Sequence, residues 1–196
     1  MIQPDPIERF REVYSLAKKI DRSVLPDPTA MALGTVGEDG SPSVRIVLLK
    51  AYDERGFVFY TNYDGRKGRE LLAAPRAALC FFWPTIDIQI RIEGSVVEVA
   101  DDEADAYFAT RHRMSQIGAW ASRQSEPLEN PDALDKRVST YEAEFEGKAV
   151  PRPPHWSGFR VQPERIEFWK GMPNRLHERH LYTRIGNGWK IETLYP

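Results

Sequence analysis

The sequence predicts a mainly β protein with peripheral helices (α+β), built as a closed or split antiparallel barrel. Many β-rich runs are joined by hairpin-type turns, such as 38–42 (EDGSP) and 53–56 (DERG). A few helical stretches interrupt these runs without alternating with them, which disfavours a doubly wound α/β fold. At 196 residues, the chain is long enough for one domain with a full hydrophobic core.

The N-terminal part of the chain predicts one helix followed by strands. In 5–20 (DPIERFREVYSLAKKI), Asp5 can cap a helix whose first residue is Pro6. The apolar residues of this stretch recur at helical spacing and therefore share one face: Ile7, Phe10, Val13, Tyr14 and Ala17. Three antiparallel strands are expected next, at 30–37, 43–52 and 56–62.

Both types of element are expected further along. A short helix at 65–75 ends near a proline, and strands follow at 77–83 and 86–100, the second strictly alternating. Helices are then predicted at 101–111, 115–124 and 130–147, and a proline-rich loop at 150–158. The last predicted strands are 158–170, 175–185 and 188–196, the final two joined by the turn 185–188 (IGNG).

The composition excludes several classes of protein. Lys and Arg total 27 against 29 for Asp and Glu, so a broad nucleic-acid-binding face is not expected. The one cysteine, Cys80, lies in an apolar run, which predicts a buried structural thiol and a reducing compartment. The N-terminus lacks a signal pattern, and no apolar run approaches the ~20 residues of a membrane span. A soluble, cytoplasmic protein without a membrane partner is expected.

Two pairs of cations lie near predicted strand ends. In 45–50 (RIVLLK), Arg45 and Lys50 are an odd number of residues apart, so a strand would place them on opposite faces. Arg66 and Lys67 come at the start of a predicted helix, where exposed N–H groups and added cations favour a phosphate. Taken alone, these two residues are more typical of a solvated helix surface.

A third group consists of Tyr107, Arg111 and Ser115, which are spaced four residues apart. On a helix they would share one face and offer a charged fork and two hydroxyls to a phosphate. A capped helix end with a satisfied arginine explains them about as well.

The stretch 175–180 (RLHERH) is the most cationic motif. If it forms a strand, Arg175, His177 and Arg179 share one face. Leu176, Glu178 and His180 then share the other. Flanking arginines would repel a metal ion, so an anion is the favoured ligand. The alternative is an exposed edge strand whose charges prevent aggregation.

Several of these motifs occur together in one order: RIVLLK, FYTN followed by GRK, SQIGAWASRQS, GFRV with IEFW, and RLHER. From about Asp27 to the C-terminus the chain resembles the pyridoxine (pyridoxamine) 5′-phosphate oxidase family. The resemblance implies a single FMN-binding split β-barrel domain over 1–196, with a helical segment at 1–26 packed on it. It also implies a homodimer with FMN in clefts between the subunits.

The resemblance assigns roles residue by residue. The implied FMN contacts are Arg45, Ile46, Val47, Leu48, Leu49, Lys50, Tyr60, Thr61, Arg66, Lys67, Gln89, Gln124, Ser125, Trp169 and Arg179. The implied substrate contacts are Lys50, Tyr107, Arg111 and Ser115 at the phosphate, with Arg175, Leu176 and His177 at the ring. Arg175 and His177 are the implied catalytic residues. No metal is implied.

The implied reaction oxidises pyridoxamine or pyridoxine 5′-phosphate to pyridoxal 5′-phosphate, with dioxygen as acceptor and hydrogen peroxide as product. Catalysis would consist mostly of positioning the substrate against the flavin. A phenazine-type flavin oxidase is the main alternative, but the phosphate-binding set favours a phosphorylated vitamer. A flavin- or vitamer-binding protein without turnover is the other alternative.

The sequence departs from the family pattern in three places. Ile88 precedes Gln89 where the family commonly has arginine, so one cation near the flavin is absent. The chain ends in LYP where relatives usually end in LAP, and no basic arm precedes 3–6 (QPDP).

Overall fold

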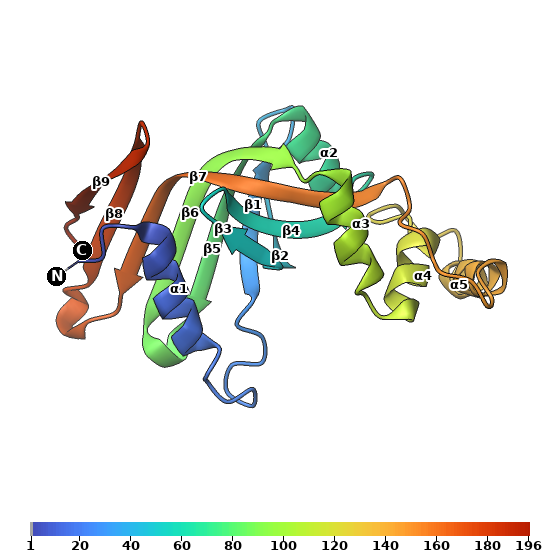
Figure 1. Cartoon of the computed structure of the whole chain (residues 1–196), viewed down its shortest axis with the longest axis horizontal. Coiled ribbons are helices and arrows are strands. Elements are labelled where there is room, and N and C mark those ends of the chain that lie inside the picture. Colours follow the sequence, from blue (N-terminus) through green and yellow to red (C-terminus); the bar gives the residue numbers. More distant parts are fainter. Residues whose placement is uncertain (1) are drawn as a thin grey trace.

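The computed structural model describes residues 2–196 and contains one curled antiparallel sheet (Figure 1). The strand order is β2-β1-β5-β6-β7-β4-β3, and β8 and β9 extend from β7. The strands are β1 Ala30–Val36, β2 Pro42–Leu48, β3 Ala51–Asp53, β4 Gly56–Asn62, β5 Arg76–Trp83, β6 Ile88–Glu98, β7 Trp156–Lys170, β8 Glu178–Ile185 and β9 Gly188–Thr193. Because β2 at one end of the order also contacts β4 near the other end, the sheet curls into a barrel.

Five α-helices flank this barrel, as the sequence predicted. They are α1 Pro6–Ala17, α2 Arg66–Ala73, α3 Asp101–Ala109, α4 Arg113–Ala121 and α5 Ala133–Glu144. Asp5 caps α1 by accepting hydrogen bonds from the backbone N–H groups of Ile7 and Glu8. None of the helices in residues 2–196 is long and apolar enough to cross a membrane.

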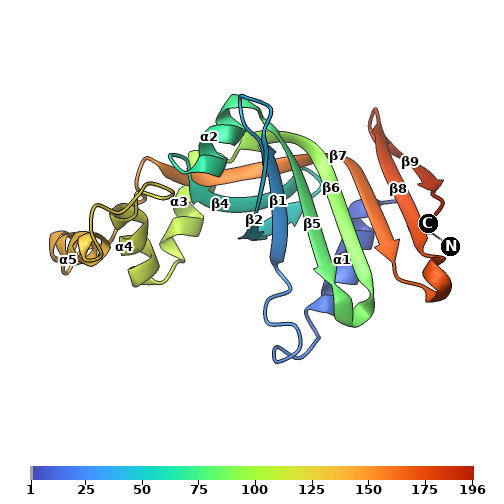
Figure 2. The ribbon, with the colours of Figure 1, turned by 180° about the vertical axis from the view of Figure 1, so that it is seen from behind.

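The hydrophobic core of residues 2–196 has a main part, a satellite and a small third cluster at Val58, Val99 and Ala104. In the main part, Phe10 of α1 is fully buried and packs on the rings of Tyr52, Phe57 and Phe81 inside the barrel. The satellite core lies beneath α3, α4 and α5 and includes Phe108. Figure 1 shows these three helices at one end of the molecule and the β8–β9 hairpin at the other, and Figure 2 shows the same separation from behind.

The long strand β7 connects the two ends. It pairs with β6, β4 and β8, so it carries both the barrel and the terminal hairpin. A β-bulge interrupts the β6–β7 ladder at Glu93/Gly94. A Cβ at Gly94 would lie 1.9 Å from the carbonyl oxygen of Gln162, so this close approach of two backbones requires glycine.

The prediction of one strand at 43–52 was wrong, because this stretch contains β2 and the start of β3. The backbone N–H of Leu49 donates to the carbonyl of Thr29, whereas that of Lys50 donates to the carbonyl of Val58. The chain therefore changes partners from β1 to β4 at a corner of the barrel. Arg45 and Lys50 belong to different segments, so the prediction that one strand places them on opposite faces was wrong.

The predicted strand across 175–180 is the second correction, because β8 begins only at Glu178. Pro173–Arg175 forms a 3-10 turn in which Asn174 and Arg175 both have left-handed backbone angles, φ 58° and φ 61°. The backbone N–H of Met172 donates to His177 Nδ1 and closes this loop on itself. Arg175 and His177 therefore do not share a strand face with Arg179.

Two smaller observations concern Cys80 and its surroundings. Its side chain is half-buried rather than fully buried, and burial raises the pKa of the thiol. A thiol with a raised pKa is a poor nucleophile, which agrees with the structural role expected for it.

His180 links the terminal hairpin to α1, and we expect this link to make stability depend on pH. Arg9 lies 3.2 Å from His180 Nδ1 and donates to the Tyr182 hydroxyl. Burial and the Arg9 charge lower the pKa of His180. The unfolded chain therefore binds a proton more readily, so the free energy of unfolding should fall as the pH drops below about 6.5.

Urea unfolding at pH 7.5 and pH 5.5 measures this effect. His180→Asn keeps an acceptor near Arg9 but does not titrate, so its stability should depend less on pH than that of the wild type. An identical pH dependence in the two proteins would contradict this origin.

Candidate functional site

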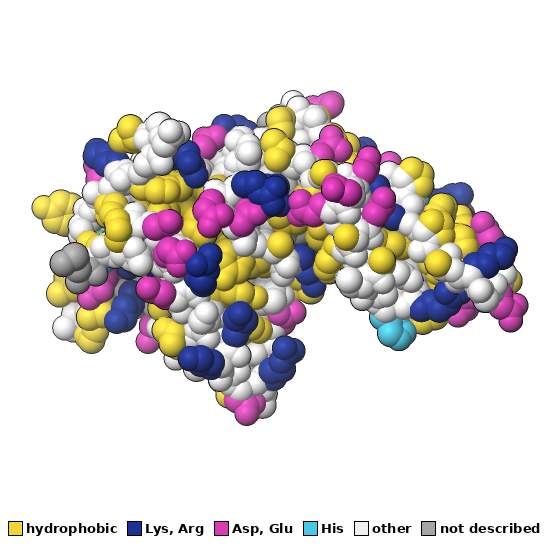
Figure 3. Space-filling view, viewed as in Figure 1, with side chains coloured by type: hydrophobic (Ala, Val, Ile, Leu, Met, Phe, Trp, Pro, Cys, Tyr) yellow, Lys and Arg dark blue, Asp and Glu magenta, His cyan; other side chains and the backbone are white. Residues whose placement is uncertain are grey.

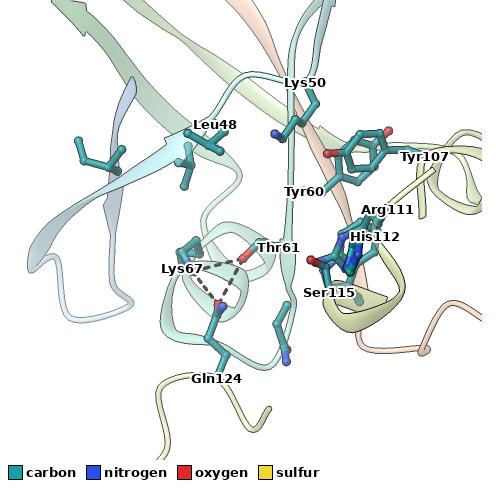
Figure 4. A pocket seen from close by; sticks show the side chains of 14 residues that line it. Leu48, Lys50, Tyr60, Thr61, Lys67, Tyr107, Arg111, His112, Ser115 and Gln124 are labelled. Atoms are coloured by element: carbon teal, nitrogen blue, oxygen red, sulfur yellow. Dashed lines mark hydrogen bonds between the residues drawn. The ribbon is translucent and has the colours of Figure 1, made fainter. Parts of the chain in front are cut away.

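A cavity of about 580 Å³ opens between the barrel and the helices α2, α3 and α4. In the space-filling view, the outline is notched between the barrel body and the α3–α5 end (Figure 3). Fourteen side chains line the cavity (Figure 4): Ile46, Val47, Leu48, Lys50, Tyr60, Thr61, Asn62, Lys67, Tyr107, Arg111, His112, Ser115, Gln124 and Trp156. Eleven of them belong to the cofactor and substrate sets that the family resemblance implies, including Tyr107, Arg111 and Ser115.

One wall of the cavity is the N-terminal turn of α2. Lys67 Nζ donates to Gln124 Oε1 at 2.7 Å and lies 3.3 Å from Thr61 Oγ1 (Figure 4). Burial and the nearby Arg45 charge lower the pKa of Lys67. Gly65 at the N-cap leaves the turn uncovered, and a Cβ there would lie 2.6 Å from Gln124 Oε1. A helix start, a half-buried ammonium group and a hydroxyl together fit a phosphate.

A second wall carries Arg111, which lies in the turn between α3 and α4. Its guanidinium stacks on the Trp156 ring at 4.6 Å, and burial lowers its pKa. Its Nη1 is buried and has no hydrogen-bond partner among residues 2–196. A buried cationic donor without a partner is costly, and an anion in the cavity would relieve that cost.

Tyr107 and Ser115 line the cavity beside Arg111, but not for the predicted reason. α3 ends at Ala109 and α4 begins at Arg113, so the three residues do not lie on one helix. The helix–turn–helix arrangement nevertheless brings all three to the same cavity. The three residues therefore lie together although the single-helix premise was wrong, and their binding of a phosphate stays a prediction.

Stacked aromatic rings form the apolar side of the cavity. Tyr60 stacks on Tyr107 at 4.1 Å and 10° and on Trp156 at 5.3 Å and 4°. Burial, with a smaller effect of the Glu103 charge, raises the pKa of Tyr60 to about 12, so its hydroxyl stays neutral. Arg160 Nη2 donates to both Glu103 carboxylate oxygens and ties α3, which carries Tyr107, to β7.

Four residues of the implied FMN set do not line the cavity, but each is next in sequence to a residue that does. Arg45 and Arg66 form ion pairs with Glu70, at 3.1 Å and 2.7 Å. Leu49 is buried in the core, and Ser125 adopts a left-handed backbone angle, φ 74°.

The remaining implied residues form a second group at the far end of β7. Gln89, Trp169 and Arg179 are register neighbours across β6, β7 and β8. The Trp169 and His177 rings are 4.5 Å apart. Arg179 Nε donates to Glu167 at 2.8 Å, and its Nη1 donates to the carbonyl of Tyr195. Arg175 and the exposed Leu176 lie in the adjoining turn.

The two groups are far apart in one chain. Trp156 lines the cavity at the start of β7 and Trp169 lies near its end, roughly 40 Å along the strand at its usual rise per residue. One copy of the chain therefore does not bring the cavity and the Arg175–Arg179 group together.

Three of the cavity residues, Asn62, His112 and Trp156, were not predicted from the sequence. Asn62 is the last residue of FYTN and Trp156 lies in the proline-rich connector, so both are next to residues that were considered. His112 follows Arg111, and its Nδ1 accepts the Met114 backbone N–H at the start of α4. A histidine at a helix N-cap is a local signal, but nothing in the sequence indicates that it faces a cavity.

Comparisons with known proteins agree with this arrangement. Residues 17–170 match the family model described as pyridoxamine 5′-phosphate oxidase. Residues 156–196 match the model of the pyridoxine 5′-phosphate oxidase C-terminal dimerisation region.

Two curated relatives span nearly the whole chain. A pyridoxine/pyridoxamine 5′-phosphate oxidase of Myxococcus xanthus (strain DK1622) is 56% identical over 196 residues, which is 100% of this chain and 94% of the relative. A protein with the same description from Rhodospirillum rubrum is 58% identical over 197 residues, covering 98% of this chain and 96% of the relative.

Two solved structures are also similar. PhzG from Burkholderia lata 383, in complex with tetrahydrophenazine-1-carboxylic acid, has a TM-score of 0.89 and 33% identity, covering 99% of this chain and 94% of that one. A pyridoxamine 5′-phosphate oxidase-related, FMN binding protein from Nostoc punctiforme PCC 73102 has a TM-score of 0.77 at 17% identity, covering 100% of both chains, and so shares the fold. With a family model matching most of its length and relatives above 50% identity, the chain belongs to the pyridoxamine 5′-phosphate oxidase family.

Proposed function

We propose that this protein is an FMN-dependent oxidase that converts pyridoxamine and pyridoxine 5′-phosphate to pyridoxal 5′-phosphate. The observation that carries the proposal is the buried, unpartnered Nη1 of Arg111 in a cavity that Tyr107 and Ser115 also line. This donor set suits the phosphate of the vitamer. The curated relatives at 56% and 58% identity bear the corresponding name.

The cavity also fits FMN. Lys67, Thr61 and Gln124 surround the start of α2 and would hold the flavin phosphate, and the edge strand β2 offers Ile46, Val47 and Leu48 as an apolar wall. When bound, FMN supplies the hydride acceptor, and dioxygen takes up the electrons to give hydrogen peroxide. The chain's own residues bind the two phosphates, exclude water and hold the substrate ring in position.

We propose further that the active protein is a homodimer with its site between subunits. The cavity and the Arg175–Arg179 group lie at opposite ends of β7, and the second group falls within the matched dimerisation region. A two-fold axis can place the second group of one subunit at the cavity of the other. The exposed apolar row Val44, Ile46 and Leu48 on the edge strand β2 favours burial against a second copy.

A phenazine-type oxidase is the second candidate, because the PhzG structure has the same fold. That relative is 33% identical, well below the vitamer oxidases. Lys50 and Arg111 give the cavity two cations besides Lys67, which match a dianionic phosphate better than the single carboxylate of a tetrahydrophenazine acid. The observations therefore favour the phosphorylated vitamer.

The test is the absorbance spectrum of the purified protein before and after anaerobic addition of pyridoxamine 5′-phosphate. We expect a yellow protein whose flavin band bleaches and returns on admission of air, with release of peroxide. A yellow protein that does not bleach would indicate a flavin binder without this activity, and a colourless protein that takes up no FMN would contradict the proposal.

Within this site, Lys67 should matter more for FMN binding than Arg66. Lys67 is half-buried and lines the cavity, whereas the Arg66 side chain is 58% exposed and paired with Glu70. We expect Lys67→Ala to weaken FMN binding by about tenfold or more, and Arg66→Ala by a few-fold at most. Flavin fluorescence titration of the apoproteins measures both, and a larger loss in Arg66→Ala would reverse this assignment.

A further inference from the structure

Behind the cavity wall, a buried carboxylate joins three elements of the fold. Glu70 of α2 is 7% exposed and accepts hydrogen bonds from β1, β2 and its own helix. Its Oε2 accepts from Thr35 Oγ1 at 2.5 Å, Ser43 Oγ at 2.7 Å and Arg45 Nη2 at 3.1 Å. Its Oε1 accepts from Arg66 Nε at 2.7 Å.

The four hydrogen-bond donors around Glu70 require its carboxyl group to be ionised. Both oxygens of Glu70 face donors, so neither a protonated acid nor an amide can satisfy all of them. Burial by itself would raise the pKa of this carboxyl, but the hydrogen bonds from Thr35, Ser43, Arg66 and Arg45 outweigh it and lower the pKa to about 2. Glu70 is therefore an anion throughout the physiological range.

The position of this anion gives it a role in the site. It lies one helical turn after Arg66, and through Ser43 and Arg45 it fixes α2 against β2. The start of α2 carries Lys67, and β2 carries the apolar wall of the cavity, so the Glu70 contacts set the distance between the two walls.

We propose that Glu70 is a positioning residue for the flavin phosphate: it holds the first turn of α2 and the Arg45 guanidinium in the arrangement that receives the phosphate. This inference rests on the proposed binding of FMN. Electrostatic repulsion predicts the opposite effect, because a carboxylate close to a phosphate repels the phosphate. Simple electrostatics predicts that removing the Glu70 charge strengthens FMN binding, whereas positioning predicts that it weakens binding.

The experiment compares FMN with riboflavin, which lacks the phosphate, on the apoprotein of Glu70→Gln. We expect the dissociation constant for FMN to rise by about tenfold or more while that for riboflavin stays within about twofold. The matched control is Glu164→Gln: Glu164 also accepts from an arginine through both oxygens, but on the exposed surface with Arg76. It should change neither constant.

A second variant keeps the test decisive if Glu70→Gln folds poorly. Ser43→Ala removes one neutral donor from Oε2 and keeps every charge, so it should shift the FMN-to-riboflavin ratio in the same direction by a smaller factor. Circular dichroism and the thermal midpoint establish folding in each case.

The outcomes distinguish a failure of the proposed phosphate site from a failure of the positioning role of Glu70. If the wild type binds FMN no better than riboflavin, the proposed phosphate site itself is wrong. If the wild type prefers FMN and both Glu70→Gln and Ser43→Ala keep or increase that preference, the positioning role of Glu70 is overturned. A parallel loss of both flavins would also overturn it, because that result indicates only a structural role.

Discussion

Arg111→Leu should lower kcat/KM for pyridoxamine 5′-phosphate by about 100-fold, equivalent to about 2.7 kcal/mol. The side chain is half-buried, and its Nη1 is buried without a hydrogen-bond partner among residues 2–196, so in the free protein no hydrogen bond compensates the desolvation of this group. The phosphate of the substrate would supply the missing partner through charge-assisted hydrogen bonds. Because this contact is the same in the ground state and the transition state, most of the loss should appear in KM.

An unphosphorylated substrate tests the assignment directly. Pyridoxamine lacks the phosphate, so Arg111→Leu should leave its slow oxidation nearly unchanged. The thermal midpoint should also stay close to that of the wild type, because leucine retains an apolar stem over Trp156 and removes a buried charge. A matched control is Arg55→Leu on the β3–β4 turn, where the arginine is exposed and paired with Asp53. Equal losses on both substrates would show that Arg111 does not bind the phosphate.

The spacing of apolar residues predicted helices and strands well where only one face of the element is buried. The spacing of Ile7, Phe10 and Tyr14 predicted α1 because these residues lie on its buried face, together with Pro6 and Ala17. The same reasoning failed at Leu49 and Lys50, because alternation continues through the barrel corner while the hydrogen-bond partners change. It failed again at Arg175, which follows Asn174 into left-handed backbone angles that asparagine tolerates but arginine rarely adopts.

The candidate site was also predicted only in part. Motif order identified Lys67, Gln124 and Arg111, which the fold brings to one cavity from α2, the segment after α4 and the α3–α4 turn. Glu70 was not identified, because a glutamate on a short helix resembles a solvated residue until its four donors are seen. The distance between the two groups along β7 is equally invisible in sequence, since it depends on how one long strand spans the molecule.

The second large expected effect concerns Arg175, which lies at the end of β7 away from the cavity. Arg175→Leu should retain FMN but lower turnover of both phosphorylated vitamers sharply, by about 100-fold or more, because the resemblance assigns it to the substrate ring. Arg179→Leu should instead reduce flavin content first, since Arg179 lies beside Trp169 in the group assigned to the cofactor. Flavin content and steady-state oxidation of the two variants measure the difference.

Mixing two inactive variants tests whether each site draws on two subunits. Arg111→Leu damages the cavity of a subunit, and Arg175→Leu damages the group at the other end of its β7. If the cavity of one subunit works with the Arg175 group of its partner, a mixed dimer contains one intact site and one doubly damaged site. Random exchange makes about half of the dimers mixed, so activity should recover to about a quarter of the wild-type value. If each site were complete within one chain, mixing would restore nothing, and the two ends of β7 would have to serve separate functions.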